Sequence, residues 1–300
     1  MRIRPLYLIS LGLVLLAAFP ALGAAQATPV ATPAANDYAH PEWLVEAGWL
    51  VRHREDAGVV VVGLTPAEEF AAGHIPGAAQ IDWPALEVID TSDASLERWR
   101  GTVEEQLTAL GISRESSVIV YDGGTLFAAR LWWILHYLDH PDVRILNGGL
   151  PAWEQAGGEV ATGAAAPEPA AAPYTGEPQP ALLAQVSEVE AALDQPEVTI
   201  IDARTPEEYG DGHIPGARNL NFPRNALPEP PRRFKPAAEL RAMYANFGAD
   251  PKEMVIPYCT TGVRSAVTFF SLALIGYEEV ALFTGSWAEW SADPARPVAP

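Results

Sequence analysis

The chain contains the same sequence pattern twice, and this duplication limits its fold more than any other feature. Residues 62–84 (VGLTPAEEFAAGHIPGAAQIDWP) match residues 201–223 (IDARTPEEYGDGHIPGARNLNFP) with a gap of one residue. Two further segment pairs match without a gap at a constant offset of 137 residues, 118–133 with 255–270 and 143–153 with 280–290. Blocks repeated in the same order indicate two copies of one domain, each somewhat longer than about 100 residues.

Each copy alternates short apolar runs, typical of buried strands, with helical patterns. In the first copy, strands are expected over 59–64, 78–83, 117–121 and 143–148, and helices over 103–111 and 128–139. In the second copy, strands are expected over 197–202, 217–222, 253–258 and 279–283, and helices over 187–194, 237–248 and 265–276. This alternation predicts an α/β fold in which helices cover both faces of a parallel sheet.

Composition separates the two copies from each other. The first copy is assigned to residues 38–157 and the second to residues 181–295. Residues 158–180 are rich in Ala, Pro and Gly and show no apolar period. They are interpreted as a linker that its prolines keep extended.

The first 27 residues have the pattern of a signal peptide. Two arginines precede an apolar run over residues 6–18, and small-residue motifs at 21–23 and 25–27 offer cleavage sites. The sequence therefore predicts export to the periplasm or the extracellular space. An uncleaved N-terminal membrane anchor is the alternative, although the apolar run is short for one.

Net charge limits the possible partners. The chain has 19 basic and 38 acidic residues, a formal net charge of −19. Nucleic acids and anionic membrane surfaces require a basic face, so neither is expected as a partner, and no membrane contact is expected after leader cleavage. The mature protein is expected to be a monomer.

Cys259 is the only cysteine of the chain and follows the expected strand 253–258. Ligands gather at the carboxyl ends of strands in parallel sheets, so Cys259 is placed where a binding site is expected. A lone cysteine is either a small buried hydrophobic residue or a reactive thiol. The repeat favours the reactive thiol, because the first copy lacks the cysteine and two polar residues together. The aligned pairs are Asp122 with Cys259, Val62 with Asp202, and Leu64 with Arg204.

Several motifs together resemble one known family. They are the two GHIPGA segments, the triplet Asp202-Ala203-Arg204, the loop CTTGVR over 259–264, and the G-x-W-x-x-W pattern over 285–290. In these motifs the chain resembles tandem-domain rhodaneses, sulfurtransferases of the thiosulfate and 3-mercaptopyruvate type, over about residues 38–295. The resemblance implies two rhodanese-like domains, each with a five-stranded parallel sheet, an inactive first domain, and the thiol near the interdomain cleft. It also implies that Arg204 binds the substrate.

The loop itself suits sulfur transfer. A helix begins near Arg264, and its N-terminus favours an anion. Gly262 permits a left-handed backbone, which turns successive amides inward. Cys259 is therefore the predicted nucleophile and persulfide carrier, and no metal or organic cofactor is expected. The predicted substrate-binding residues are Arg204, Arg264, Thr260, Thr261, Gly262 and Val263, with Asp202 in support.

The two arginines each have a structural alternative. Arg204 either binds an anionic donor, so that Arg204→Ala mainly raises KM, or forms an ion pair with Asp202 or Glu207. Arg264 either faces the anion or anchors the start of the helix. His74 and His213 recur in both copies and are interpreted as structural residues.

Spacing and loop composition separate the candidate reactions. Four residues lie between Cys259 and Arg264, whereas the similar cell-cycle phosphatases and arsenate reductases have five between their cysteine and arginine, so sulfur is favoured over phosphate. The loop CTTGVRS resembles bacterial thiosulfate-type enzymes more than mercaptopyruvate enzymes. The preferred function is transfer of sulfur from thiosulfate, a small anionic donor, to cyanide or a thiol. The alternatives are a 3-mercaptopyruvate sulfurtransferase and a non-catalytic persulfide carrier.

Overall fold

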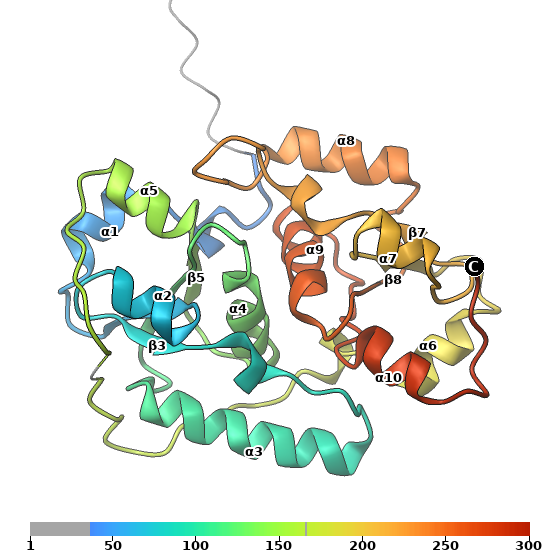
Figure 1. Ribbon diagram of the computed structural model, residues 1–300, viewed down its shortest axis with the longest axis horizontal. Coiled ribbons are helices and arrows are strands. Elements are labelled where there is room, and N and C mark those ends of the chain that lie inside the picture. The colour runs from blue at the N-terminus through green and yellow to red at the C-terminus, as the bar shows by residue number, and fades with distance from the viewer. Residues whose placement is uncertain (1–36, 166) are drawn as a thin grey trace, which may run out of the picture. The chain divides into compact units, whose positions relative to one another are not determined.

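The computed structural model describes residues 37–165 and 167–300, which contain two α/β units (Figure 1). The predicted signal peptide, residues 1–27, lies outside these described residues. Within the described ranges, no helix is long and apolar enough to cross a bilayer.

The first copy forms a regular five-stranded parallel sheet in the order β1-β5-β4-β2-β3. Its strands are β1 (Leu44–Val45), β2 (Val59–Leu64), β3 (Ala79–Ile81), β4 (Ser117–Tyr121) and β5 (Val143–Leu146). Its helices are α1 (Ala47–His53), α2 (Ala67–Ala72), α3 (Asp93–Ala109), α4 (Ala128–Tyr137) and α5 (Gly149–Gln155). Alternate residues of β4 enter two separate apolar clusters, Val118 and Val120 one and Ile119 and Tyr121 the other. Both faces of the sheet are thus buried, which confirms the predicted fold class.

The second copy has the same strand order but a shorter regular sheet. Its strands are β6 (Thr199–Asp202), β7 (Arg218–Asn219) and β8 (Val255–Tyr258), in the order β7-β6-β8. Its helices are α6 (Val186–Ala192), α7 (Pro206–Gly210), α8 (Ala237–Phe247), α9 (Val263–Leu274) and α10 (Ser286–Ala292). The two outer positions are single parallel bridges, Val255 with Val280 and Leu183 with Leu282.

Pro257 explains why the predicted strand 279–283 is reduced to bridges. The pairing begins regularly, since Val255 N–H donates to Glu279 O and Ala281 N–H donates to Val255 O. The next ladder bond would come from the N–H of residue 257, and proline has none. Val120 holds the aligned position in the first copy, where β4 pairs regularly with β5.

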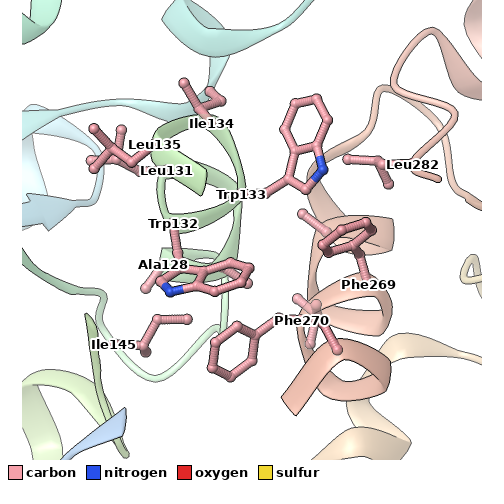
Figure 2. Close-up of a cluster of buried hydrophobic side chains, with 14 of the residues drawn as sticks. Ala128, Leu131, Trp132, Trp133, Ile134, Leu135, Ile145, Phe269, Phe270 and Leu282 are labelled. Carbon is pink, nitrogen blue, oxygen red and sulfur yellow. The ribbon is translucent and has the colours of Figure 1, made fainter. Parts of the chain in front are cut away.

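Helices α4 and α9 join the two copies through an apolar contact with approximate two-fold symmetry. Trp132 packs against Phe270 with ring centroids 4.7 Å apart, and Trp133 packs against Phe269 at 6.4 Å, both nearly perpendicular (Figure 2). The offset of 137 aligns Trp132 with Phe269 and Trp133 with Phe270. Each residue therefore contacts the counterpart of its neighbour, as in the interface of a symmetric dimer. Such aromatic pairs contribute about 0.5–1.5 kcal/mol each beyond their buried area.

The connection between the copies is extended and held against the first copy. Ala161 pairs with His74, and the hydroxyl of buried Tyr174 lies 3.1 Å from Nδ1 of His140. These contacts order residues 158–165 and 167–180 along the first copy rather than leaving them as a free tether.

Candidate active site

The turn after β8 brings a backbone amide to the sulfur of Cys259. Gly262 has φ 87°, in the left-handed region that the sequence predicts for it, and α9 begins at the next residue, Val263. This bend directs the Gly262 N–H to Sγ at 3.2 Å. The amide is therefore placed to stabilise negative charge on the sulfur.

The start of α10 supports the same turn from behind. Cys259 N–H donates to Oγ of Ser286 at 3.1 Å, and Trp287 N–H donates to the Cys259 carbonyl at 3.0 Å. Ala288 N–H donates to the Thr260 carbonyl at 3.0 Å. Ser286 has φ 55°, a conformation that is strained for a residue other than glycine, so the contacts around it must hold it there.

The thiol is more deeply buried than the sequence alone indicates. Cys259 is 1% exposed, whereas Thr260 and Thr261 beside it are partly exposed. Val263, which the sequence predicts to bind the substrate, is also buried.

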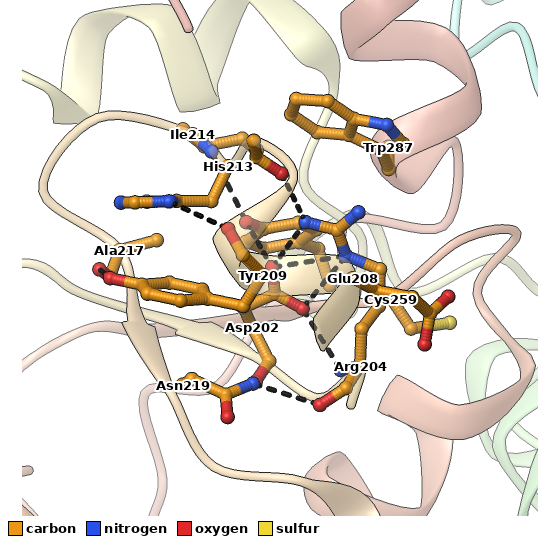
Figure 3. Close-up of polar contacts among 12 residues, drawn as sticks. Asp202, Arg204, Glu208, Tyr209, His213, Ile214, Ala217, Asn219, Cys259 and Trp287 are labelled. Carbon is orange, nitrogen blue, oxygen red and sulfur yellow. Dashed lines mark hydrogen bonds and ion pairs between the residues drawn. The ribbon is translucent and has the colours of Figure 1, made fainter. Parts of the chain in front are cut away.

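Arg204 forms a buried ion pair with Asp202 (Figure 3). Its Nε lies 3.1 and 3.0 Å from the two carboxylate oxygens, and its Nη2 lies 2.6 Å from Oδ2 and 2.7 Å from the Gly212 carbonyl. The Trp287 ring lies over the guanidinium at 4.6 Å. Tyr258 donates its hydroxyl proton to Asp202 at 2.6 Å, and burial, followed by the Asp202 charge, raises the pKa of Tyr258.

Arg204 therefore forms the ion pair that was one of its two interpretations from the sequence, and its partner is Asp202 and not Glu207. Within the described residues, Nη1 makes no hydrogen bond, and the side chain is 4% exposed. Donor binding by Arg204 stays a prediction and is restricted to this one nitrogen.

Arg264 anchors the loop to α7. Its Nη1 and Nη2 lie 2.7 and 2.8 Å from the two carboxylate oxygens of Glu208, and Nη2 also donates to Oγ1 of Thr260. Hydrogen bonding to Glu208 raises the pKa of Arg264, and a Cys259 anion adds to that rise. The guanidinium therefore both anchors the loop and lies near the sulfur, so the two alternatives for Arg264 are compatible.

The ion pair of Arg264 with Glu208 makes the stability of the folded protein depend on pH in the acid range. The Arg264 hydrogen bond is the main reason that the pKa of Glu208 falls to about 2 from its usual 4.5. A lowered pKa in the folded state adds stability above pH 4.5 that is lost as the pH falls toward about 2. We expect Glu208→Gln to flatten the decline in unfolding free energy between these pH values, measured by urea denaturation.

Glu207→Gln is the matched control for that measurement. Glu207 is the adjacent glutamate, and it has no ion pair within the described residues. We expect Glu207→Gln to show the same decline in unfolding free energy at acid pH as the wild type. The same decline in Glu208→Gln would show that the pair with Arg264 contributes nothing to it.

Two first-copy residues reach the loop, and sequence reasoning missed both. Thr261 donates its hydroxyl proton to Glu87, and Arg130 lies against Gly262. A methyl group on Gly262 would lie 3.2 Å from Nη1 of Arg130. One signal was available for Arg130, because the aligned residue of the second copy is the apolar Val267.

The turn of the first copy binds a carboxylate of its own. Oδ1 of Asp122 accepts N–H bonds from Gly124 at 2.7 Å and Thr125 at 2.8 Å, and Oδ2 accepts one from Ala128 at 2.8 Å. Asp122 is 4% exposed, and burial raises its pKa against the effect of these amides. In the first copy, the Asp122 carboxylate thus closes the turn that corresponds to the Cys259 turn of the second copy.

The two GHIPGA segments have the same structural role in both copies. His74 stacks on Phe70 with centroids 3.9 Å apart, and His213 stacks on Tyr209 at 3.7 Å. The Nδ1 of each histidine lies within hydrogen-bond distance of the carbonyl of the residue on which it stacks. These contacts support the structural interpretation of the histidines.

Comparison with known proteins agrees with the duplicated architecture. The family model of the Rhodanese-like domain matches residues 46–156 and 185–293. The sulfur carrier protein TtuD of Thermus thermophilus is 33% identical over 287 residues, which are 87% of this chain and 98% of that protein. A thiosulfate sulfurtransferase of Corynebacterium glutamicum is 33% identical over 292 residues, 89% of this chain and 93% of that enzyme.

Two further relatives carry the other donor in their names. A probable 3-mercaptopyruvate sulfurtransferase of Pseudomonas aeruginosa is 37% identical over 206 residues, 65% of this chain and 71% of that protein. The crystal structure of the 3-mercaptopyruvate sulfurtransferase SseA of Escherichia coli is similar with a TM-score of 0.71 and 30% identity. It covers 82% of this chain and 99% of its own. The chain therefore belongs to the rhodanese family, as a tandem-domain member among the sulfurtransferases.

Proposed function

We propose that the protein transfers the outer sulfur of thiosulfate to a thiophilic acceptor, cyanide or a thiol, through a persulfide on Cys259. The observation that carries this proposal is the turn around Cys259, where the Gly262 amide lies 3.2 Å from the sulfur at the start of α9. Such a site favours the thiolate, which is the nucleophilic form of cysteine.

The reaction proceeds in two displacements. The Cys259 thiolate attacks the outer sulfur of thiosulfate, an S–S bond forms, and sulfite leaves with the electron pair of the broken bond. Cyanide then attacks the outer sulfur of the persulfide, which gives thiocyanate and returns the electron pair to Sγ. Atoms and charges balance without an oxidant or reductant, and the covalent intermediate predicts ping-pong kinetics.

The aligned turn around Asp122 is evidence that the Cys259 turn can bind the outer sulfur of a persulfide. The carboxylate oxygens of Asp122 and the outer sulfur of a persulfide are the same number of bonds from the backbone. Three N–H groups converge on those oxygens in the first copy. The helix of the first copy begins at Ala128, whereas α9 begins two aligned positions earlier, so the kind of cradle is shared and not each amide. We infer that loop amides hold the outer sulfur, as backbone nests hold other anions.

Two alternatives remain candidates because relatives at similar identity carry those names. TtuD is named a sulfur carrier protein, which favours a persulfide carrier, and the name of the Pseudomonas aeruginosa protein favours 3-mercaptopyruvate as the donor. The burial of Cys259 favours a small donor in either case.

Steady-state kinetics of the full chain with both donors tests the proposal. We expect kcat/KM for thiosulfate with cyanide to exceed that for 3-mercaptopyruvate by at least about tenfold. Thiosulfate alone should add about 32 Da, one sulfur atom, to the intact protein. The opposite preference would establish the mercaptopyruvate reaction, and an adduct without turnover would establish a carrier. Hydrolysis of an aryl phosphate without any adduct would overturn sulfur transfer.

A further inference from the structure

Among the residues that the structure describes, Arg130 has no ion-pair partner for its charge. Arg130 is 0% exposed in the first turn of α4. Its Nη1 donates to Oγ1 of Thr284 at 2.9 Å and its Nη2 donates to the Leu86 carbonyl at 2.7 Å, both neutral acceptors. Its Nε has no hydrogen-bond partner among the described residues, and no carboxylate of these residues is close enough to form an ion pair with it.

A buried cation without a counter-charge is strongly unfavourable. Burial lowers the pKa of Arg130 to about 10, so the guanidinium remains charged at neutral pH. The rings of Trp133 and Trp99 lie 5.0 and 5.9 Å from the guanidinium carbon, and cation–π contacts offset only part of such a cost. The first turn of a helix is also an unfavourable place for a cation.

The sulfur of Cys259 is a candidate counter-charge. Nη1 of Arg130 lies beside Gly262, and the Gly262 amide bonds to Sγ. Negative charge on Cys259 acts on Arg130 more strongly than that of Glu87, the other anion nearby. The remaining charges around the sulfur, Arg264 and Glu208, are already paired with each other.

The duplication gives independent support. The approximate two-fold contact of α4 with α9 relates Arg130 to Val267 and Cys259 to Asp122. The copy that lacks the thiol thus supplies the arginine, and the copy that holds the thiol has valine at the related position. Of these two related positions, only the one whose side chain lies beside the Cys259 loop carries a cation.

We propose that Arg130, supplied by the first copy, is the electrostatic partner of anionic Cys259 and holds the loop through Thr284 and Gly262. For the thiolate this inference depends only on the geometry. For the persulfide it rests on the proposed function.

The test is a pH titration of the thiolate by its ultraviolet absorbance, with Cys259→Ser as the blank. Absorbance needs no reagent to reach the buried sulfur, and the single cysteine makes the difference signal specific. Arg130→Met keeps the side-chain length and leaves no carboxylate without its cation, because no carboxylate of the described residues forms an ion pair with Arg130. We expect the midpoint of the thiolate titration in Arg130→Met to lie about one pH unit or more above that of the wild type. Arg130→Lys keeps the charge and should move the midpoint less than half as far.

Glu87→Gln is the matched control, because it removes the opposite charge from the same loop contact. It should lower the midpoint, whereas a loosened contact between the copies would shift both variants in the same direction. A midpoint for Arg130→Met within about 0.3 units of the wild type would overturn the inference, as would parallel shifts in both variants. Thiolate titration without any thiosulfate adduct would leave the role of Arg130 intact and reject the proposed function instead.

Discussion

Cys259→Ser is expected to lower kcat/KM with thiosulfate and cyanide by at least about 10⁴-fold, because a hydroxyl can neither attack as a thiolate nor carry the transferred sulfur. The substitution is nearly isosteric, and Ser286 continues to accept the N–H of residue 259. The thermal midpoint should therefore change little. Thiocyanate formation and intact mass, measured on the same preparation, check the result.

Asp122→Asn is the matched control for this loss. It alters the same position of the turn in the first copy, where the carboxylate accepts three backbone N–H bonds. We expect its kcat/KM per folded molecule to stay within about twofold of the wild type. A Cys259→Ser variant that still forms thiocyanate and a sulfur adduct would place the carrier elsewhere and reject the mechanism.

Arg204→Ala is expected to reduce the unfolding free energy by about 3–5 kcal/mol, because it leaves the Asp202 carboxylate buried without its cation. Asp202 is 0% exposed and would retain only Tyr258 and the backbone N–H of residue 204. The ion pair thus adds an expected loss of stability to the sequence-based expectation of a raised KM, which stays a prediction. Urea denaturation of the full chain measures the loss.

Two variants separate burial from charge. Arg264→Ala breaks the more exposed pair with Glu208, whose side chains are 19% and 36% exposed, and should reduce stability by about 0–1 kcal/mol. The double substitution Asp202→Val with Arg204→Leu borrows the residues of the first copy, Val62 and Leu64, and should recover most of the stability. A raised KM in this folded double variant would support donor binding by Nη1, whereas equal losses in Arg204→Ala and Arg264→Ala would refute the burial argument.

The sequence predicted what local pattern and repetition encode. Apolar runs indicate the strands, and the offset of 137 residues aligns Asp122 with Cys259. The positive φ of Gly262 followed from the need for a sharp turn before α9. Local rules of this kind depend only on neighbouring residues, so one chain suffices to read them.

Other features depend on contacts between distant segments. Glu87 and Arg130 act on a loop of the other copy, and no periodic pattern marks such a meeting. Helix α3 begins ten residues before its predicted start. Its charged first half shows little apolar period in the sequence, because only Trp99 in that half is buried. The effect of Pro257 on the sheet likewise appears only once its pairing partner is known.

The crossed aromatic contact between α4 and α9 has an evolutionary consequence. An ancestral homodimer built from one unit would have to present identical groups at both ends of this contact, so any cation beside one sulfur would also stand beside the other. Fusion of the two genes removes that restriction and lets each half specialise. Variation in the copy without the cysteine should therefore be tested for its effect on activity as carefully as variation beside Cys259.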